Sequence, residues 1–101
     1  MARKIVWSDP AVDDLEAAVE FIAKDSPAYA ANLAQLAMDA AESLVRFPNR
    51  GHRVPDPELA RLRELVVGSY RLIYLVEAKR VLIVALLHGH RALRLALKGR
   101  A

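Results

Sequence analysis

Histidine, arginine and aspartate side chains of the C-terminal half are the residues of this chain best suited to chemistry. His88 and His90 follow the last apolar run, and an imidazole can transfer a proton or bind a metal ion near neutral pH. A metal site needs further ligands, and no third one lies nearby in the sequence, so we expect no metal. Asp56 stands between two prolines, where a carboxylate most often belongs to a turn.

Positive charge is concentrated in the same half of the chain. Residues 48–101 contain eleven lysines and arginines against four acidic residues, whereas residues 1–47 contain four against eight. Nine of those eleven are arginine, whose planar guanidinium suits bidentate contact with phosphate or carboxylate. The distribution indicates a surface that meets an anionic partner, and the alternative is an ordinary solvated arginine-rich surface.

The composition excludes several classes of protein. With no cysteine, the chain has no disulfide, thiolate zinc site, iron–sulfur cluster or cysteine nucleophile. It contains no catalytic triad, phosphate-binding loop or dinucleotide-binding glycine pattern, so we expect no cofactor. The longest uncharged apolar run, residues 81–87, is too short to span a membrane, and the N-terminus does not resemble a signal peptide. We therefore expect a cytoplasmic protein without membrane contact.

One domain over residues 1–101 must position these side chains. Residues 4–7 are β-branched and aromatic and predict a strand, and Ser8 is placed to cap a helix over about residues 10–24. Ser26 and Pro27 repeat the cap pattern, so a second helix follows after a connection that allows only an antiparallel hairpin. Its predicted buried stripe is Tyr29, Leu33, Leu36, Ala40, Leu44 and Phe47.

The remainder of the chain predicts a sheet. Residues 48 to about 60 should be an irregular loop, because two of its prolines flank a single residue. Three strand-length runs at about 61–67, 70–76 and 81–87 predict an antiparallel meander. The last run is apolar on both faces, which indicates cover by the helices on one side and by a partner or the C-terminal segment on the other. A short basic helix over residues 90–98 completes an α+β protein of order β-α-α-β-β-β.

Alternation along the strands predicts which side chains share a face. Arg71 should share a face with Ile73 and Leu75, where it could pair with Glu64 across the strands. His88 continues the face of Leu82, Val84 and Leu86 and is expected to form a local hydrogen bond.

Several pieces of the sequence, taken in order, resemble the ParE/RelE toxin superfamily. They are Trp7-Ser8 with Ala11 and Asp14-Leu15, Phe21-Ile22-Ala23 with Asp25-Ser26-Pro27, Phe47-Pro48 with Gly51 and Arg53, the run from Arg63 to Tyr74, and His88-Gly89-His90-Arg91. Together they cover residues 5 to about 92. The resemblance implies a helical hairpin packed on a small, curved antiparallel sheet, and the role of toxin in a type II toxin–antitoxin pair.

The pieces around Arg63 and His88 are more similar to the ParE, plasmid-stabilisation branch. That branch implies a protein that inhibits growth by binding and poisoning DNA gyrase and is neutralised by a ParD-like cognate antitoxin from the same operon. Such binding needs no catalytic group. The candidate target-binding or antitoxin-binding residues are Arg61, Arg63, Arg71, Arg91 and Arg94.

The alternative implied by the resemblance is a RelE-like, ribosome-dependent mRNA endoribonuclease. Its candidate catalytic residues are Arg71 for phosphate, His88 or His90 at the strand end, and Asp56 as a carboxylate. The lysine-rich cluster of RelE is absent, because the second half contains only Lys79 and Lys98. A third possibility is a non-toxic relative that is retained as a regulator.

Overall fold

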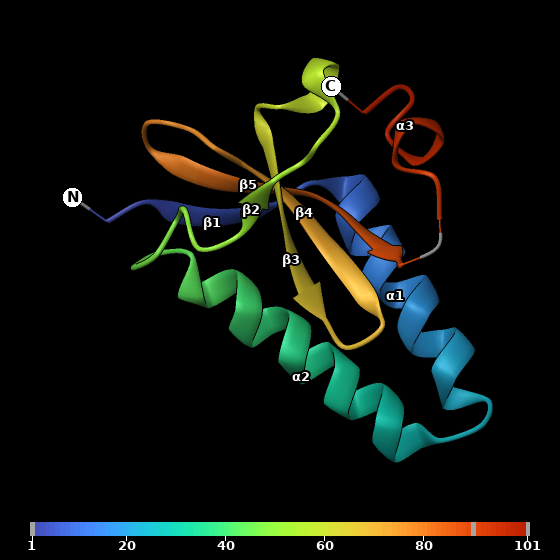
Figure 1. The fold of residues 1–101 in the computed structure, drawn as a ribbon. Coiled ribbons are helices and arrows are strands. Elements are labelled where there is room, and N and C mark those ends of the chain that lie inside the picture. Colours follow the sequence, from blue (N-terminus) through green and yellow to red (C-terminus); the bar gives the residue numbers. More distant parts are fainter. Residues whose placement is uncertain (1, 90, 101) are drawn as a thin grey trace.

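The N-terminal strand lies beside the last strand of a five-stranded sheet of order β1-β5-β4-β3-β2 (Figure 1). The computed structural model describes residues 2–89 and 91–100. The elements are β1 (Lys4–Trp7), α1 (Asp9–Ala23), α2 (Pro27–Ser43), β2 (His52–Arg53), a 3-10 turn η1 (Pro57–Leu59), β3 (Leu62–Val67), β4 (Tyr70–Val76), β5 (Arg80–His88) and α3 (Leu93–Ala96). Strand β1 runs parallel to β5, and the other neighbours are antiparallel. The predicted α+β order, helical hairpin and meander are confirmed.

Serine caps and a carboxylate of α1 complete the hydrogen bonds where elements begin or end. Ser8 Oγ accepts from Ala11 N at 3.2 Å, and Ser26 Oγ accepts from Tyr29 N at 3.2 Å, as the cap patterns predict. Strand β1 ends opposite Ile83, and beyond it Asp14 Oδ2 accepts the β5 hydrogen bond of Leu86 N at 3.0 Å. Helix α1 therefore covers an edge of β5 that β1 leaves open.

The buried stripe of α2 differs from the predicted one. Tyr29, Leu36 and Phe47 are 69%, 44% and 61% exposed. The buried residues of the helix are Ala30, Leu33, Ala37 and Ala41, and Leu44 is buried just after its end. Alanines have little bulk, so they let α2 approach the sheet closely, and the larger side chains are left at the margin of the interface.

The segment predicted to be irregular, residues 48–60, contains the short strand β2 and the turn η1. Its start is fixed by the buried Tyr74, whose hydroxyl accepts from Gly51 N and donates to Pro48 O, both at 2.9 Å. Burial raises the pKa of Tyr74, so this phenol remains a neutral donor. The loop prediction was therefore wrong at His52 and Arg53, which pair with Glu64 and Arg63 of β3.

A bulge in β5 reverses the alternation of its side chains. Ile73 lies opposite Ala85 while Tyr74 lies opposite Ile83, so Val84 is an extra residue. Leu82 and Val84 consequently line the face opposite the helical hairpin, whereas Leu86 packs in the core on the hairpin side. By alternation His88 follows Leu86, and the prediction that it shares a face with Leu82 and Val84 was wrong.

The C-terminal segment covers the face of the sheet opposite the hairpin. Ile73, Ala85 and Leu87 pack there with Ala96, together with Leu93 and Leu97. The helix is shorter than predicted, because it spans only Leu93–Ala96. Two sets of ion pairs hold this segment: Arg94 with Asp56 and Glu58, and Arg100 with the Oδ2 and Oδ1 atoms of Asp14 at 2.6 and 2.9 Å.

Gly51→Ala should destabilise the fold by about 2–3 kcal/mol, because overpacking in a filled site costs about that much. An added Cβ would lie 2.7 Å from both Glu64 O and the Tyr74 hydroxyl oxygen. Urea unfolding followed by circular dichroism measures the change. Gly89→Ala is the control: among the described residues the added methyl group has one close neighbour, Ser69 O at 3.3 Å, so the change should cost less than about 1 kcal/mol. Equal stability of the two variants would contradict this account.

Docking of α3 should weaken in acid. Hydrogen bonds from Arg94 hold the pKa of Asp56 below its ordinary value, so this stabilisation is present above the unfolded-state pKa and is lost as the pH falls through the folded-state pKa. The loss should therefore occur below about pH 4. Nuclear magnetic resonance of the Arg94 side-chain Nε–H between pH 6 and 2 follows it, with near-ultraviolet circular dichroism reporting the global fold. In the Asp56→Asn/Glu58→Gln double variant, which removes both carboxylate partners of Arg94, this transition should be absent, and an unchanged titration would refute the assignment.

Candidate functional site

Glu64 is the centre of a polar group on the sheet face opposite the hairpin. It is 9% exposed and is the one buried charged residue among those that the structure describes. Its Oε1 lies 2.7 Å from His52 Nε2, and its Oε2 accepts from Arg71 Nη1 at 3.1 Å. The predicted pairing of Arg71 with Glu64 is confirmed. A buried carboxylate requires such partners, because an isolated buried charge is very costly.

Arg71 is occupied by contacts within the protein. Besides Glu64, its Nη2 donates to the backbone oxygen of Arg91 at 2.8 Å, and its Nε is buried without a hydrogen-bond partner. The side chain is 23% exposed. Arg71 thus joins the sheet to the segment that leads into α3, and only part of its guanidinium could meet an incoming anion.

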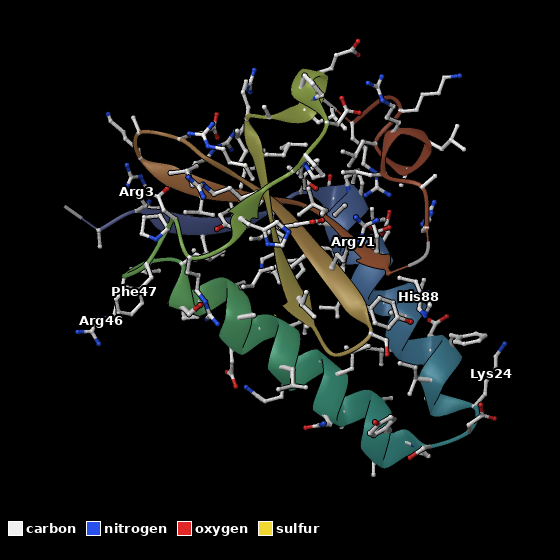
Figure 2. All side chains as sticks on the ribbon, viewed as in Figure 1. Arg3, Lys24, Arg46, Phe47, Arg71 and His88 are labelled. Carbon is white, nitrogen blue, oxygen red and sulfur yellow. The ribbon has the colours of Figure 1, made fainter. Side chains whose placement is uncertain are left out.

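His88 lies at the end of β5 on the side of α1. Its ring packs edge-to-face on Tyr70 with centroids 5.5 Å apart, and it lines a shallow cleft of about 200 Å³ with Asp14, Phe21 and Arg91. Figure 2 labels Arg71 and His88 on the neighbouring strands β4 and β5, and the alternation described above assigns them to opposite faces of the sheet. His90, the other histidine of the prediction, lies outside the described residues.

Asp56 is paired with a cation rather than with the other catalytic candidates. Arg94 Nη2 donates to its Oδ1 at 2.8 Å, and Asp56 also caps η1 by accepting from Glu58 N at 3.0 Å. Arg71, His88 and Asp56 therefore belong to three separate groups of contacts.

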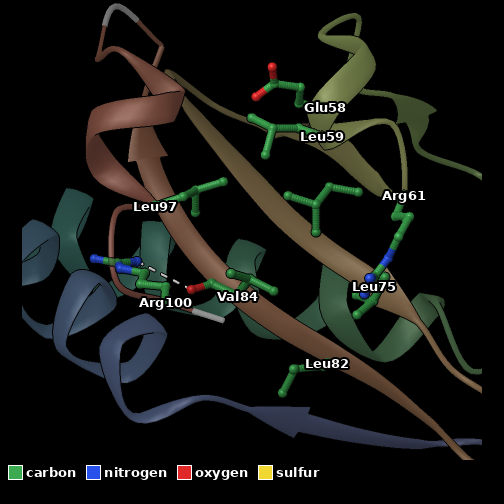
Figure 3. A pocket seen from close by; sticks show the side chains of 9 residues that line it. Glu58, Leu59, Arg61, Leu75, Leu82, Val84, Leu97 and Arg100 are labelled. Carbon is green, nitrogen blue, oxygen red and sulfur yellow. Dashed lines mark hydrogen bonds between the residues drawn. The ribbon is translucent and has the colours of Figure 1, made fainter.

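The five candidate binding arginines have different environments. Arg71 and Arg94 are ion-paired, as described above. Arg63 Nη1 donates to Gly51 O at 2.7 Å, Arg91 is exposed, and Arg61 borders a cleft of about 170 Å³ (Figure 3). Among the described residues Arg61, Arg63 and Arg91 form no ion pair with a carboxylate, so their positive charge is not neutralised by one.

The cleft beside Arg61 is mostly apolar and lies between η1, the sheet and the C-terminal segment. Leu59, Leu75, Leu82, Val84 and Leu97 line it, and Arg100 closes one side (Figure 3). Arg100 is fixed there by Asp14 and by Val84 O at 3.2 Å. The hydrogen bonds that Arg100 donates to Asp14 raise the pKa of Arg100, so this guanidinium stays charged.

Metal-binding clusters and membrane-spanning helices are absent from residues 2–89 and 91–100. That part of the chain has no group of three or more side chains suited to holding a metal ion. It also has no helix of the length and apolarity needed to cross a bilayer.

His52 was not predicted to be a partner of Glu64. Their contact depends on the register of β2, in which His52 lies opposite Glu64. A strand of two residues has no periodicity to detect, and the neighbouring prolines indicate a loop. The period-two pattern of β3 puts Glu64 on the same face as Leu62, and this alone indicated that Glu64 would need a polar partner.

Comparison with known proteins agrees with this fold. The profile of the family described as ParE toxin of type II toxin–antitoxin system, parDE, matches residues 5–93. Toxin RelE2 of Caulobacter vibrioides is 37% identical over 89 residues, which cover 87% of this chain and 97% of that protein.

Solved structures of such toxins share the fold. The chromosomal ParDE system of P. aeruginosa matches with a TM-score of 0.72 at 20% identity, over 86% of this chain and 96% of that one. The RelBE2 toxin–antitoxin complex of Mycobacterium tuberculosis matches with a TM-score of 0.60 at 24% identity, over 87% and 99%. The profile match and the identity to RelE2 show that this chain belongs to the ParE toxin family of type II toxin–antitoxin systems, within the ParE/RelE superfamily.

Proposed function

We propose that this toxin inhibits growth by binding and poisoning DNA gyrase in the cytoplasm, and that a ParD-like cognate antitoxin neutralises it. The observation that carries the proposal is the separation of the three side chains that the sequence predicts for an RNA-cleaving mechanism, Arg71, His88 and Asp56. Cleavage at a ribose 2′-hydroxyl requires a base, a cation at the phosphate and an acid for the leaving oxygen, all within reach of one phosphodiester. Arg71, His88 and Asp56 do not meet that requirement together.

Binding to a protein target requires a less exact arrangement of side chains than RNA cleavage does. A protein target can be held by arginines and apolar side chains spread over a surface, since a few such residues supply most of the binding energy. Arg61, Arg63 and Arg91 have no carboxylate partner among the described residues, and the cleft beside Arg61 is apolar. These features support a role in binding a target or antitoxin.

A RelE-like mRNA endoribonuclease is the second candidate, and one specific observation favours it. His52 and Arg71 both contact Glu64, so an exposed imidazole, a carboxylate that orients it and a cation lie within one group. Such a pair resembles the arrangement of a general base and the residue that positions it. The name of the relative Toxin RelE2 points in the same direction.

Antitoxin-free protein added to gyrase, relaxed plasmid and ATP should inhibit supercoiling and trap cleaved DNA at micromolar concentration. Agarose gels with and without detergent and protease measure both effects. The His88→Ala/His90→Ala double variant should retain inhibition within about tenfold, because a binder loses only single contacts.

A parallel reaction separates the two candidates. With translating ribosomes and a defined mRNA, primer extension should reveal no new cleavage sites for the wild type or for His52→Ala. The nuclease would replace gyrase binding as the proposed function if two results were found together. The wild type would cleave the mRNA, with a loss of about a hundredfold or more in His52→Ala, and gyrase would be unaffected.

A further inference from the structure

Three arginines that have no carboxylate partner among the described residues gather where β2 meets β3. Arg53 and Arg63 lie directly opposite each other in the register, and Arg50 precedes the same strand. Their guanidinium groups donate to neutral oxygens: Arg50 to Ser43 Oγ at 2.7 Å, Arg63 to Gly51 O at 2.7 Å and Arg53 to Ala60 O at 3.4 Å. Like charges opposite each other across strands are destabilising, and a bound anion would remove that cost.

Arg63 also lies beside the Arg50 backbone, because its Nη1 donates to Asn49 O at 3.4 Å and to Gly51 O at 2.7 Å. Both charges favour the ionised form of the Tyr74 hydroxyl and so oppose part of the effect of burial on the pKa of Tyr74. The loop fixed by that hydroxyl thus brings Arg50 to the same end of the sheet as the Arg53–Arg63 pair.

The edge of β3 beside these arginines has no neighbouring strand among the described residues. Strand β2 pairs only with Arg63 and Glu64, which leaves residues 65–67 at the edge. Val67 and Tyr70 flank the two-residue turn and exchange hydrogen bonds, so by alternation the backbone N–H and C=O of Val66 point away from β4. Val66 is 67% exposed, and its backbone can accept a further strand.

One shallow cleft adjoins this edge, and a second cleft shares Arg50 with it. One, of about 290 Å³, is lined by Leu36, Ala40, Val66 and Asp39, and the other, of about 480 Å³, by Phe47 and Ser43. Figure 2 shows Phe47 at the C-terminal end of α2, pointing away from the body of the protein. Apolar contacts are therefore available on both sides of Arg50, with Asp39 as the one carboxylate among the cleft-lining residues.

We infer that residues 65–67 of β3, together with Arg50, Arg53 and Arg63, form a docking site for an extended acidic peptide segment. The segment adds to the sheet as a strand beside Val66, and its carboxylates meet the three arginines while apolar side chains contact Leu36 and Phe47. The open strand edge favours a peptide over RNA, because nucleic acid cannot continue the backbone ladder. The net negative charge required of the partner follows from the unpaired arginines, and the inference does not depend on gyrase as target.

A labelled ten-residue peptide of alternating glutamate and valine is the probe, with a matched peptide in which glutamine replaces glutamate. Fluorescence anisotropy at low salt should give binding of the acidic peptide only. Arg50→Gln and Arg53→Gln should each weaken it about tenfold, since a charge-assisted contact is lost. Arg80→Gln is the control: it removes the same charge from an exposed arginine at the β4–β5 turn and should change binding less than twofold. Only variants whose thermal unfolding midpoint matches that of the wild type are included in the comparison.

Amide hydrogen exchange tests the strand addition separately. The Val66 amide should exchange at least about tenfold more slowly with peptide bound, as expected for a new ladder hydrogen bond. Equal weakening by Arg80→Gln, or unchanged Val66 exchange, would overturn the inference. Tighter binding of a ten-nucleotide oligouridine through the same arginines would assign the surface to RNA, and a dimer dissociated by the peptide in sedimentation would assign it to a second copy; either result also overturns it.

Discussion

The buried hydroxyl of Tyr74 is the contact on which the geometry of the polar surface depends. It binds Gly51 N and Pro48 O, and so joins the loop that leaves α2 to the middle of the sheet. Because Gly51 lies against both this hydroxyl and Glu64 O, the next residues must follow β3. That single anchoring point aligns His52 with Glu64 and Arg53 with Arg63, although β2 is only two residues long. The few ladder hydrogen bonds of a strand this short stabilise its pairing with β3 only slightly. The buried hydrogen bonds of the Tyr74 hydroxyl provide further stabilisation.

The extra residue Val84 has an equally large effect on which side chains can act together. Strand β5 must pack against α1 on one face and α3 on the other, and the bulge lets apolar residues satisfy both faces. It also turns His88 toward α1, while Arg71 stays with Glu64 on the opposite face. One inserted residue therefore places the arginine and the histidine of the strand ends on opposite faces of the sheet.

The features that were predictable from the sequence are those with a local physical signal. Ser8 and Ser26 cap their helices, and alternation around Ile73 was sufficient to predict the pairing of Arg71 with Glu64. The bulge had no such signal, since the run from residue 81 to 87 is apolar in either alternation. Tyr29, Leu36 and Phe47 fit a helical stripe equally well, but the alanines of α2 form the closer contact with the sheet. These outcomes depend on packing between distant segments, which periodicity does not encode.

The contacts divide the arginines of the C-terminal half into those that are ion-paired within the protein and those that are not. Arg71, Arg94 and Arg100 are ion-paired and hold the sheet and the C-terminal segment together. Arg94, a candidate for binding a partner, is bound by Asp56 and Glu58 within the protein. A count of arginines therefore overestimates the charge available to a partner, because an ion-paired arginine must first give up its carboxylate. The arginines of β2 and β3 carry no such cost, so anion recognition is physically easier at that end of the sheet than along α3.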